Sequence, residues 1–189
     1  SAASRTDAGV HAKGQVVHFL TTSSLCLHKL QGSLNSLLDE AISVLKLEEA
    51  PIQFHSTLNC IKKEYWYHVC FGKVQNPFFR RTSWHFPHFL EFDDMQEAAL
   101  NLLGEHDFSA FCNQRPSWNR SVICNVKDLS ILPLSKDRVR FIIFGDHFLY
   151  KMVRNLVGTL VYIGCSKLPL DQVSSFLMNK DRTQIGMTA

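Results

Sequence analysis

The run Ser-Arg-Thr-Asp-Ala-Gly-Val-His-Ala, residues 4–12, contains a carboxylate in a setting suited to chemistry. Arg5 brings a cation close to Asp7, and Gly9 lets the backbone turn where a side chain would clash. Thr6 can hydrogen-bond to the nearby backbone and fix the loop. We therefore interpret Asp7 as a reactive acid held exposed on a loop. A plain surface turn is the competing interpretation, because short motifs often match by chance.

A second pattern combines a basic residue with two phenols. Residues 61–71 are rich in aromatic and β-prone side chains and end at a glycine, which predicts a strand. Because side chains alternate along a strand, Lys63, Tyr65 and Tyr67 would project from one face. The competing interpretation is a core strand with packed tyrosines and a solvated lysine.

A third pattern places positive charge on an apolar helix. Residues 148–161 show apolar side chains at helical spacing, and Lys151 and Arg154 lie three positions apart, so we expect both on one helix face. Gly158, one turn later, would let another group approach closely. A guanidinium on such a helix needs an anion, and Asp7 is an available partner. Snorkelling of Arg154 to water is the alternative.

Composition narrows the class of protein without naming a function. The chain has 189 residues, is 46% hydrophobic and 20% charged, and carries a net charge of +3, which permits a nucleic-acid partner without requiring one. Its six cysteines form no CxxC pair and its nine histidines are dispersed, so we expect no metal site. Reduced thiols and the lack of a signal peptide or long apolar run favour a cytoplasmic protein.

The remaining sequence predicts the elements that must position these residues. Asp93 and Gln96 resemble a capping box, and Gly104 resembles a helix terminator. We expect strands at 16–21 and 42–47, helices at 27–38, 93–103 and 170–178, a buried turn at 106–111, and a hairpin of strands 121–134 and 138–144.

Taken together, the motifs resemble the tRNA pseudouridine synthase A family, and the resemblance runs through essentially all 189 residues. The motifs are found in the family's order: the 4–12 run, Lys63-x-Tyr65-x-Tyr67, Gly-x-His-Asp-Phe-x-x-Phe at 104–111, Phe-Leu-Tyr-x-Met-Val-Arg-Asn-x-x-Gly at 148–158, and Lys-Asp-Arg at 180–182. Several ordered motifs are far more specific than any one of them.

The resemblance implies isomerisation of uridine to pseudouridine at positions 38 to 40 of the tRNA anticodon arm, without cofactor or metal, by a homodimer. It implies an α+β fold of two ferredoxin-like α/β-sandwich halves that share a central antiparallel sheet with a catalytic cleft between them. We expect the halves at 1–75 and 76–189. The family also has a strand and helix before the aspartate loop and a strand after the Lys-Asp-Arg motif, and we expect both to lie outside this sequence.

By position in the motifs, the resemblance implies that Asp7 is the catalytic aspartate, Tyr65 the active-site tyrosine and Arg154 the basic partner of the aspartate. We expect Asp7 and Arg154 to lie within salt-bridge distance. The residues expected to bind the RNA substrate are Arg5, Thr6, His11, Lys63, Tyr65, Arg80, Arg81 and Lys151.

Two other functions are open at this point. One is a non-catalytic tRNA-binding or RNA-folding module on the same scaffold, although binding alone needs no nucleophile. The other is an unrelated α+β hydrolase using Asp7 and His11, for which the sequence offers neither a nucleophile–base pattern nor metal-ligand spacing.

Overall fold

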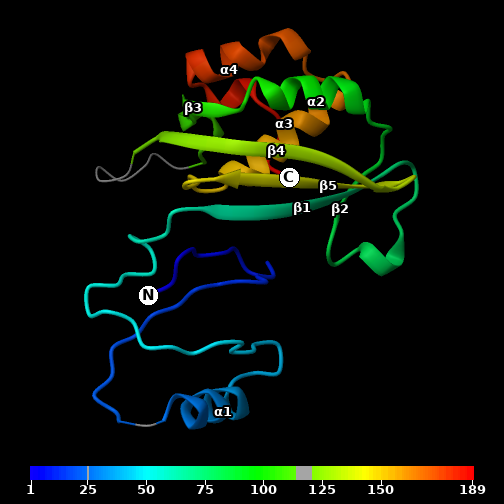
Figure 1. Ribbon diagram of the computed structural model, residues 1–189. Helices are drawn as coiled ribbons and strands as arrows, with labels where there is room; N and C mark the ends of the chain where they lie inside the picture. The colour runs from blue at the N-terminus through cyan, green and yellow to red at the C-terminus, as the bar shows by residue number, and fades with distance from the viewer. Residues whose placement is uncertain (25, 114–120) are drawn as a thin grey trace. The chain divides into compact units, whose positions relative to one another are not determined.

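The computed structural model describes residues 1–24, 26–113 and 121–189, which form two compact units, residues 1–60 and 61–189 (Figure 1). Each unit has its own internal contacts and is described separately. Within the described ranges, no helix is long and apolar enough to cross a membrane.

The unit of residues 61–189 is built on a five-stranded mixed sheet with the order β2-β1-β5-β4-β3. Its strands are β1 (Lys63–Phe71), β2 (Trp84–Phe86), β3 (Gly104–Asp107), β4 (Ile123–Ser135) and β5 (Arg138–Gly145). Only the β1–β2 pair is parallel among these strands, and the other three pairs are antiparallel. The predicted strand at 61–71 and the predicted hairpin of β4 and β5 are confirmed.

Helices cover one face of this sheet, namely α2 (Phe92–Leu100), α3 (Met152–Gly164) and α4 (Val173–Asn179). Short 3-10 turns connect the elements: η1 (Pro77–Phe79), η2 (Ser109–Phe111), η3 (Leu170–Gln172) and η4 (Arg182–Gln184). The helices predicted over 148–161 and 170–178 are confirmed, with η3 forming the first turn of the latter.

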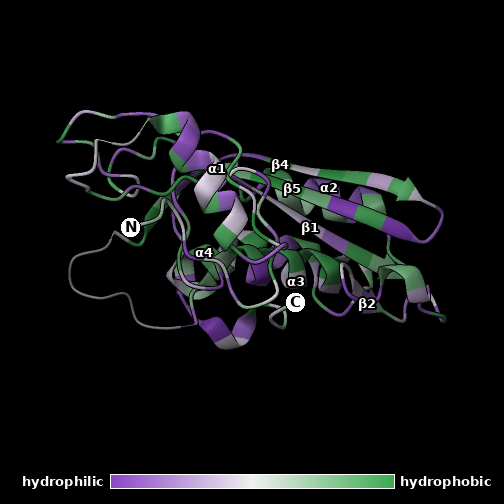
Figure 2. Cartoon of the chain, turned by 90° about the horizontal axis from the view of Figure 1, so that it is seen from below, coloured by the Kyte–Doolittle hydropathy of each residue, from purple (hydrophilic) through white to green (hydrophobic). Residues whose placement is uncertain are grey.

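Alternation along the strands creates the core between sheet and helices. Val69, Phe141 and Ile143 are fully buried, whereas Arg138 and Arg140 project from the opposite face of β5. The alternation of hydrophilic and hydrophobic residues is visible along the sheet strands in Figure 2. The 106–111 motif adds two fully buried rings, Phe108 and Phe111, which pack edge to face. The predicted buried turn is therefore confirmed, with β3 leading into it.

The unit of residues 1–60 contains one helix, α1 (Leu27–Leu37), among its described residues. This helix was predicted, but none of its residues is buried. Ser56 is the one buried residue that the structure describes in this unit, and large apolar side chains such as Leu20, Leu45 and Leu58 are at least 77% exposed. Hydrogen bonds, rather than a packed core, hold the described part of this unit, and some join residues far apart in sequence, such as the Thr57 hydroxyl, which donates to the Ala2 carbonyl at 2.7 Å.

Four local predictions are wrong. The strands expected at 16–21 and 42–47 do not form, since Val17 makes only an isolated bridge with Ala2 and the second stretch has no strand partner. The capping box at Asp93 is absent because α2 begins after Glu91, which makes no side-chain cap. Gly104 does not end α2. It begins β3 with a φ of +96°.

The fold class is therefore α+β, as predicted. The division into ferredoxin-like halves at 1–75 and 76–189 stays a prediction.

Candidate active site

Asp7 lies at the start of an exposed β-turn in the unit of residues 1–60. The Asp7 carbonyl accepts a hydrogen bond from the Val10 N–H at 3.2 Å, and Gly9 has a φ of +79° at the third position of the turn. That conformation favours glycine. Asp7 itself is exposed on this turn, as the sequence predicted.

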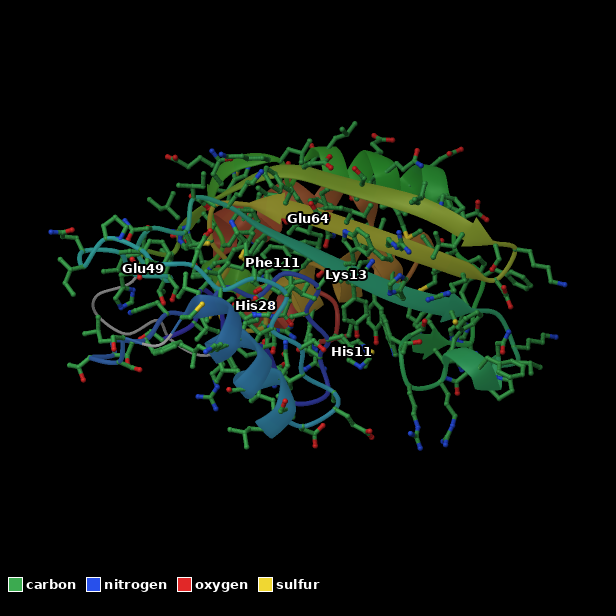
Figure 3. The ribbon with its side chains drawn as sticks, turned by 60° about the horizontal axis from the view of Figure 1, so that its bottom comes forward. His11, Lys13, His28, Glu49, Glu64 and Phe111 are labelled. Carbon is green, nitrogen blue, oxygen red and sulfur yellow. The ribbon has the colours of Figure 1, made fainter. Side chains whose placement is uncertain are left out.

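Hydrogen bonds close the base of this loop. The Ala3 N–H donates to the Val16 carbonyl at 2.8 Å, and the Gln15 side chain bonds the Ser4 backbone in both directions. These contacts hold the start of the motif while its tip stays open to solvent. Arg5 and His11 are exposed on the same loop, and Thr6 is half-buried. His11 is labelled in Figure 3.

The tyrosines of β1 lie on the helix-covered face of the sheet in the other unit. Tyr65 pairs with Ile143 across the ladder and meets the Phe148 ring edge to face, with centroids 5.2 Å apart. Tyr67 is partly buried against the core and hydrogen-bonds to the side chain of Arg154. Burial raises the pKa of Tyr67, and the Arg154 charge acts in the opposite direction. This tyrosine therefore stays a neutral phenol at neutral pH.

Arg154 lies in the first turn of α3, and groups of its own unit orient its guanidinium. Its Nε donates to the Ala189 carbonyl at 2.5 Å, in addition to the bond with Tyr67. The cluster of Tyr65, Tyr67 and Arg154 thus combines an apolar stacking surface with a fixed cation. The predicted ion pair between Arg154 and Asp7 stays a prediction.

Lys151 differs from its prediction. It precedes α3 with φ 60° and ψ 10°, a left-handed conformation, and so does not share a helix face with Arg154. Its ammonium instead lies 5.3 Å from the centroid of the Tyr150 ring. A side chain in this backbone region is strained, and such strain is common near functional sites.

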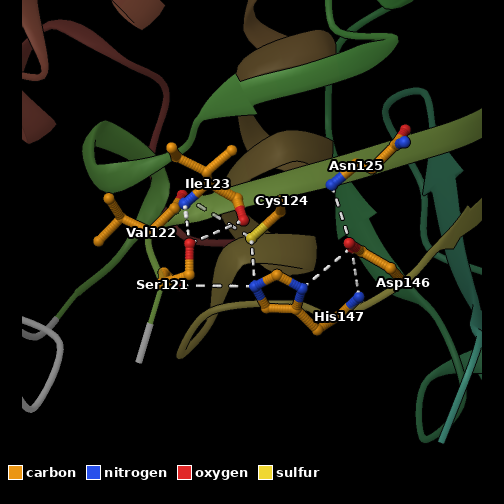
Figure 4. Close-up of polar contacts among 7 residues, drawn as sticks. All are labelled: Ser121, Val122, Ile123, Cys124, Asn125, Asp146 and His147. Carbon is orange, nitrogen blue, oxygen red and sulfur yellow. Dashed lines mark hydrogen bonds and ion pairs between the residues drawn. The ribbon is translucent and has the colours of Figure 1, made fainter. Parts of the chain in front are cut away.

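A polar cluster fixes the connection between β5 and α3 (Figure 4). The Asp146 carboxylate accepts from the backbone N–H of Asn125 at 3.0 Å and pairs with His147, whose Nε2 lies 3.3 Å from the Cys124 Sγ. Burial opposes the ionisation of Asp146, but hydrogen bonds from the backbone N–H groups of Asn125 and His147, together with the His147 side chain, outweigh burial and lower the pKa of Asp146. The cluster therefore anchors the loop that carries Phe148.

The thiol, imidazole and carboxylate of this cluster have the order of a cysteine hydrolase triad but not its chemistry. Cys124 is fully buried, and burial raises the pKa of its thiol to about 12. A nucleophilic cysteine needs the opposite, a lowered pKa and access to substrate. The geometry therefore argues against Cys124 as a nucleophile.

The other predicted RNA-binding residues of the unit of residues 61–189 lie away from the core. Lys63 is half-buried at the start of β1, and Arg80 and Arg81 are exposed after η1. Arg138 lies near them in the fold, because its guanidinium stacks on the Phe79 ring at 4.0 Å. Arg80 and Arg81 can therefore reach an anionic partner at little desolvation cost.

The sequence did not indicate the roles of Tyr67, Asn155 and Arg182. Tyr67 contacts Arg154 directly, Asn155 is buried beside it, and the Arg182 Nη2 donates to the Asn155 Oδ1 at 3.2 Å. The motifs contain all three, but their partners are distant in sequence. An asparagine within the apolar helical stripe, next to the motif arginine, was the available signal.

Comparison with known proteins identifies the family. A family model described as tRNA pseudouridine synthase matches residues 98–189. The chain is 50% identical to tRNA pseudouridine synthase A 2 of Protochlamydia amoebophila, covering 100% of this chain and 72% of the relative. It is 40% identical to tRNA pseudouridine synthase A of Bacillus pumilus, covering 100% and 75%, and 40% identical to that of Bacillus subtilis, covering 98% and 74%. The chain belongs to the tRNA pseudouridine synthase A family, a family of isomerases.

Proposed function

We propose that this protein converts uridine to pseudouridine at positions 38 to 40 of the tRNA anticodon arm, with Asp7 as the nucleophile. The relatives named above, which are tRNA pseudouridine synthases at 40 to 50% identity, support tRNA as the substrate. The observation that carries the proposal is the cluster of Tyr65, Tyr67 and Arg154 at one end of a packed sheet. Binding alone would require no nucleophilic carboxylate.

The reaction breaks the bond between the ribose C1′ and the uracil N1 and joins C1′ to C5 of the same ring. The proton at C5 is lost and N1 gains one, so the product is an isomer and no cofactor is consumed. The Asp7 carboxylate starts the reaction by attacking either C1′ of the ribose or C6 of the base. It attacks as the carboxylate anion, and Arg154 is its proposed basic partner.

Tyr65 stacks on the extruded uracil and receives the C5 proton, directly or through a water molecule. Its edge-to-face contact with Phe148 holds the ring in place. Extruding a base costs a few kcal/mol. Contacts to the RNA offset this cost. They come from the cations Lys63, Lys151, Arg80, Arg81 and Arg5, and from Thr6 and His11.

The proposal extends to the assembly and its location. The active form is a homodimer of chains with two ferredoxin-like halves and a catalytic cleft between the halves, and it acts on tRNA in the cytoplasm. The family resemblance supports these points.

Tritium release from an anticodon stem-loop tests the function. The substrate is an unmodified stem-loop with uridines labelled at C5 at positions 38, 39 and 40, and the control carries cytidine at those positions. We expect the full-length protein to release tritium from the first RNA and none from the second. RNA binding without tritium release would contradict the proposal and favour the non-catalytic tRNA-binding module.

A further inference from the structure

The segment Ile185–Ala189, which we call the docked segment, is bonded to α3 along its length. The Gly186 N–H donates to the Thr159 Oγ1 at 3.1 Å, and the Ala189 N–H donates to the Arg154 carbonyl at 3.2 Å. Two backbone groups of the docked segment are therefore satisfied by one helix. This places the segment over the turn of α3 that begins with Arg154.

Close approach of the docked segment depends on Gly158. A Cβ atom added to Gly158 would overlap the Met187 carbonyl, and one added to Gly186 would lie 2.5 Å from the Gly158 carbonyl oxygen. The sequence predicted that Gly158 leaves room for a group to approach, and this is confirmed. The two glycines allow the segment and the helix backbone to touch.

Asn155 joins the docked segment to the rest of the core through all the hydrogen bonds that its side chain can make. Its Nδ2 donates to the Phe111 carbonyl and to the Asn113 Oδ1, both at 2.6 Å. Its Oδ1 accepts from the Thr188 hydroxyl at 2.7 Å and from the Arg182 Nη2 at 3.2 Å. A carboxamide has two donors and two acceptor sites. The side chain is fully buried, so losing any partner is costly.

The planar guanidinium of Arg182 holds the docked segment through several hydrogen bonds. Nη1 donates to the Gly186 carbonyl at 3.1 Å, and Nη2 donates to the Thr188 hydroxyl at 2.9 Å as well as to Asn155. Burial lowers the pKa of Arg182, but a guanidinium stays charged at neutral pH. A lysine could not make these three bonds from one rigid group.

The docked segment in turn orients the guanidinium of Arg154 through the Ala189 carbonyl. We propose that Arg182 and Asn155 are positioning residues for Arg154: they fix the docked segment, and the segment fixes the guanidinium. The inference rests on the proposed function, in which Arg154 serves the reacting aspartate. A displacement of about 1 Å can cost about 100-fold in rate.

Arg182→Gln tests whether Arg182 positions Arg154 through the docked segment, because it removes the guanidinium while leaving a polar side chain. We expect the single-turnover rate of pseudouridine formation at saturating protein to fall about 10- to 100-fold. The Kd for the stem-loop should change less than about threefold, since Arg182 contacts protein groups. Arg182→Lys should rescue little of the rate. Lys127→Gln, which removes an exposed cation from β4, is the charge-matched control and should match the wild type.

Coupling to Arg154 separates a positioning role from a merely structural one. If Arg182 acts through Arg154, adding Arg182→Gln to Arg154→Ala should slow the reaction less than about threefold further. A double variant whose loss of rate equals the product of the two single losses would overturn the inference. So would a wild-type rate in Arg182→Gln when Arg154→Ala is slow. A wild-type rate in Arg154→Ala alone would instead overturn the proposed role of Arg154 itself.

Thr159 supplies a second pair of variants in case Arg182→Gln does not fold. Its hydroxyl accepts from the Gly186 N–H and donates to the Asn155 carbonyl at 2.8 Å. Thr159→Val keeps the shape and loses the hydroxyl, whereas Thr159→Ser keeps the hydroxyl. We expect a slowed single-turnover rate for the valine variant and a rate near wild type for the serine variant. Equal rates in a folded pair would contradict the inference.

Discussion

The two units of the chain hold their functional side chains by different means. Asp7 lies on an exposed turn in a unit whose described residues bury only Ser56. Arg154 lies in the first turn of α3, a helix with ten buried residues, and its guanidinium is bonded to Tyr67 and Ala189. The acid is therefore presented by local backbone geometry, and the cation is positioned by a core. Substitutions near Asp7 should change the chemistry alone, whereas those around Arg154 should change stability as well.

Matched removals of a phenyl ring should show this contrast most strongly. Phe108→Ala removes a fully buried ring and should lower the free energy of unfolding by about 3–5 kcal/mol. Phe19→Ala removes a ring that is 53% exposed in the other unit and should change it by less than about 0.5 kcal/mol. Urea titration followed by circular dichroism measures both. Equal losses would show that residues 1–60 contribute as much core as residues 61–189.

Removing the cation should affect the reaction more than RNA binding. Arg154→Ala should slow single-turnover pseudouridine formation by about 10²- to 10³-fold, because a preorganised charge acts on the reacting groups. Arg154→Lys should recover part of the rate, since it keeps the charge without the geometry. The Kd for the stem-loop should stay within about threefold of wild type. A loss seen only in Kd would assign Arg154 to RNA binding instead.

Thiol labelling compares the units without changing the chain. Cys26 is exposed, whereas Cys124 is fully buried with a pKa raised to about 12. At pH 8 iodoacetamide should modify Cys26 at least about 100-fold faster, because the thiolate is the reactive form. Peptide mass spectrometry of the native protein gives both rates. Comparable labelling would mean that the start of β4 opens readily.

Acid stability should depend modestly on Asp107. Burial opposes its ionisation, but hydrogen bonds from Lys180 and Ser109 outweigh burial and lower the pKa of Asp107. A lowered pKa stabilises the fold above the unfolded value near 3.8, and this stability is lost as the pH falls through the folded pKa. Asp107→Asn should lower the free energy of unfolding by about 1 kcal/mol at pH 7, as measured by urea titration. The expected loss is small because the Lys180 side chain is half-exposed and solvent screens its charge.

The matched control for Asp107 is Asp171→Asn, which changes an exposed carboxylate. It should leave the free energy of unfolding unchanged at pH 7 and at acidic pH. The difference between Asp107→Asn and wild type should shrink as the pH falls below 3.8. A cost that stays constant down to pH 2 would show that shape, rather than charge, makes Asp107 favourable.

The sequence predicted those elements whose pattern is local and whose partners follow directly. The apolar stripe of α3 and the alternation of β5 each define one buried face, and the residues of the element itself predict that face. The hairpin of β4 and β5 needs only a short turn. In contrast, the predicted strand at 16–21 depends on a partner strand, and Val17 has only a single bridge.

For the candidate site, the sequence indicated the chemistry but not the contacts that position it. The motifs identified Asp7, Tyr65 and Arg154 as the expected catalytic groups. The contact of Tyr67 with Arg154 and the bond of Arg182 with Asn155 join residues 87 and 27 positions apart. Such pairings follow from the packed fold and from no local pattern. The left-handed backbone of Lys151 was also missed, because a lysine gives no indication of a positive φ.

A comparison of the wild type with Asp7→Ala tests most directly whether Asp7 is the nucleophile. Wild type and Asp7→Ala are assayed for tritium release from the labelled anticodon stem-loop under single-turnover conditions, with the Kd measured for each. We expect a rate loss of at least about 10⁴-fold in the variant, with Kd and thermal stability close to wild type. Tritium release within tenfold of wild type by Asp7→Ala would contradict the claim.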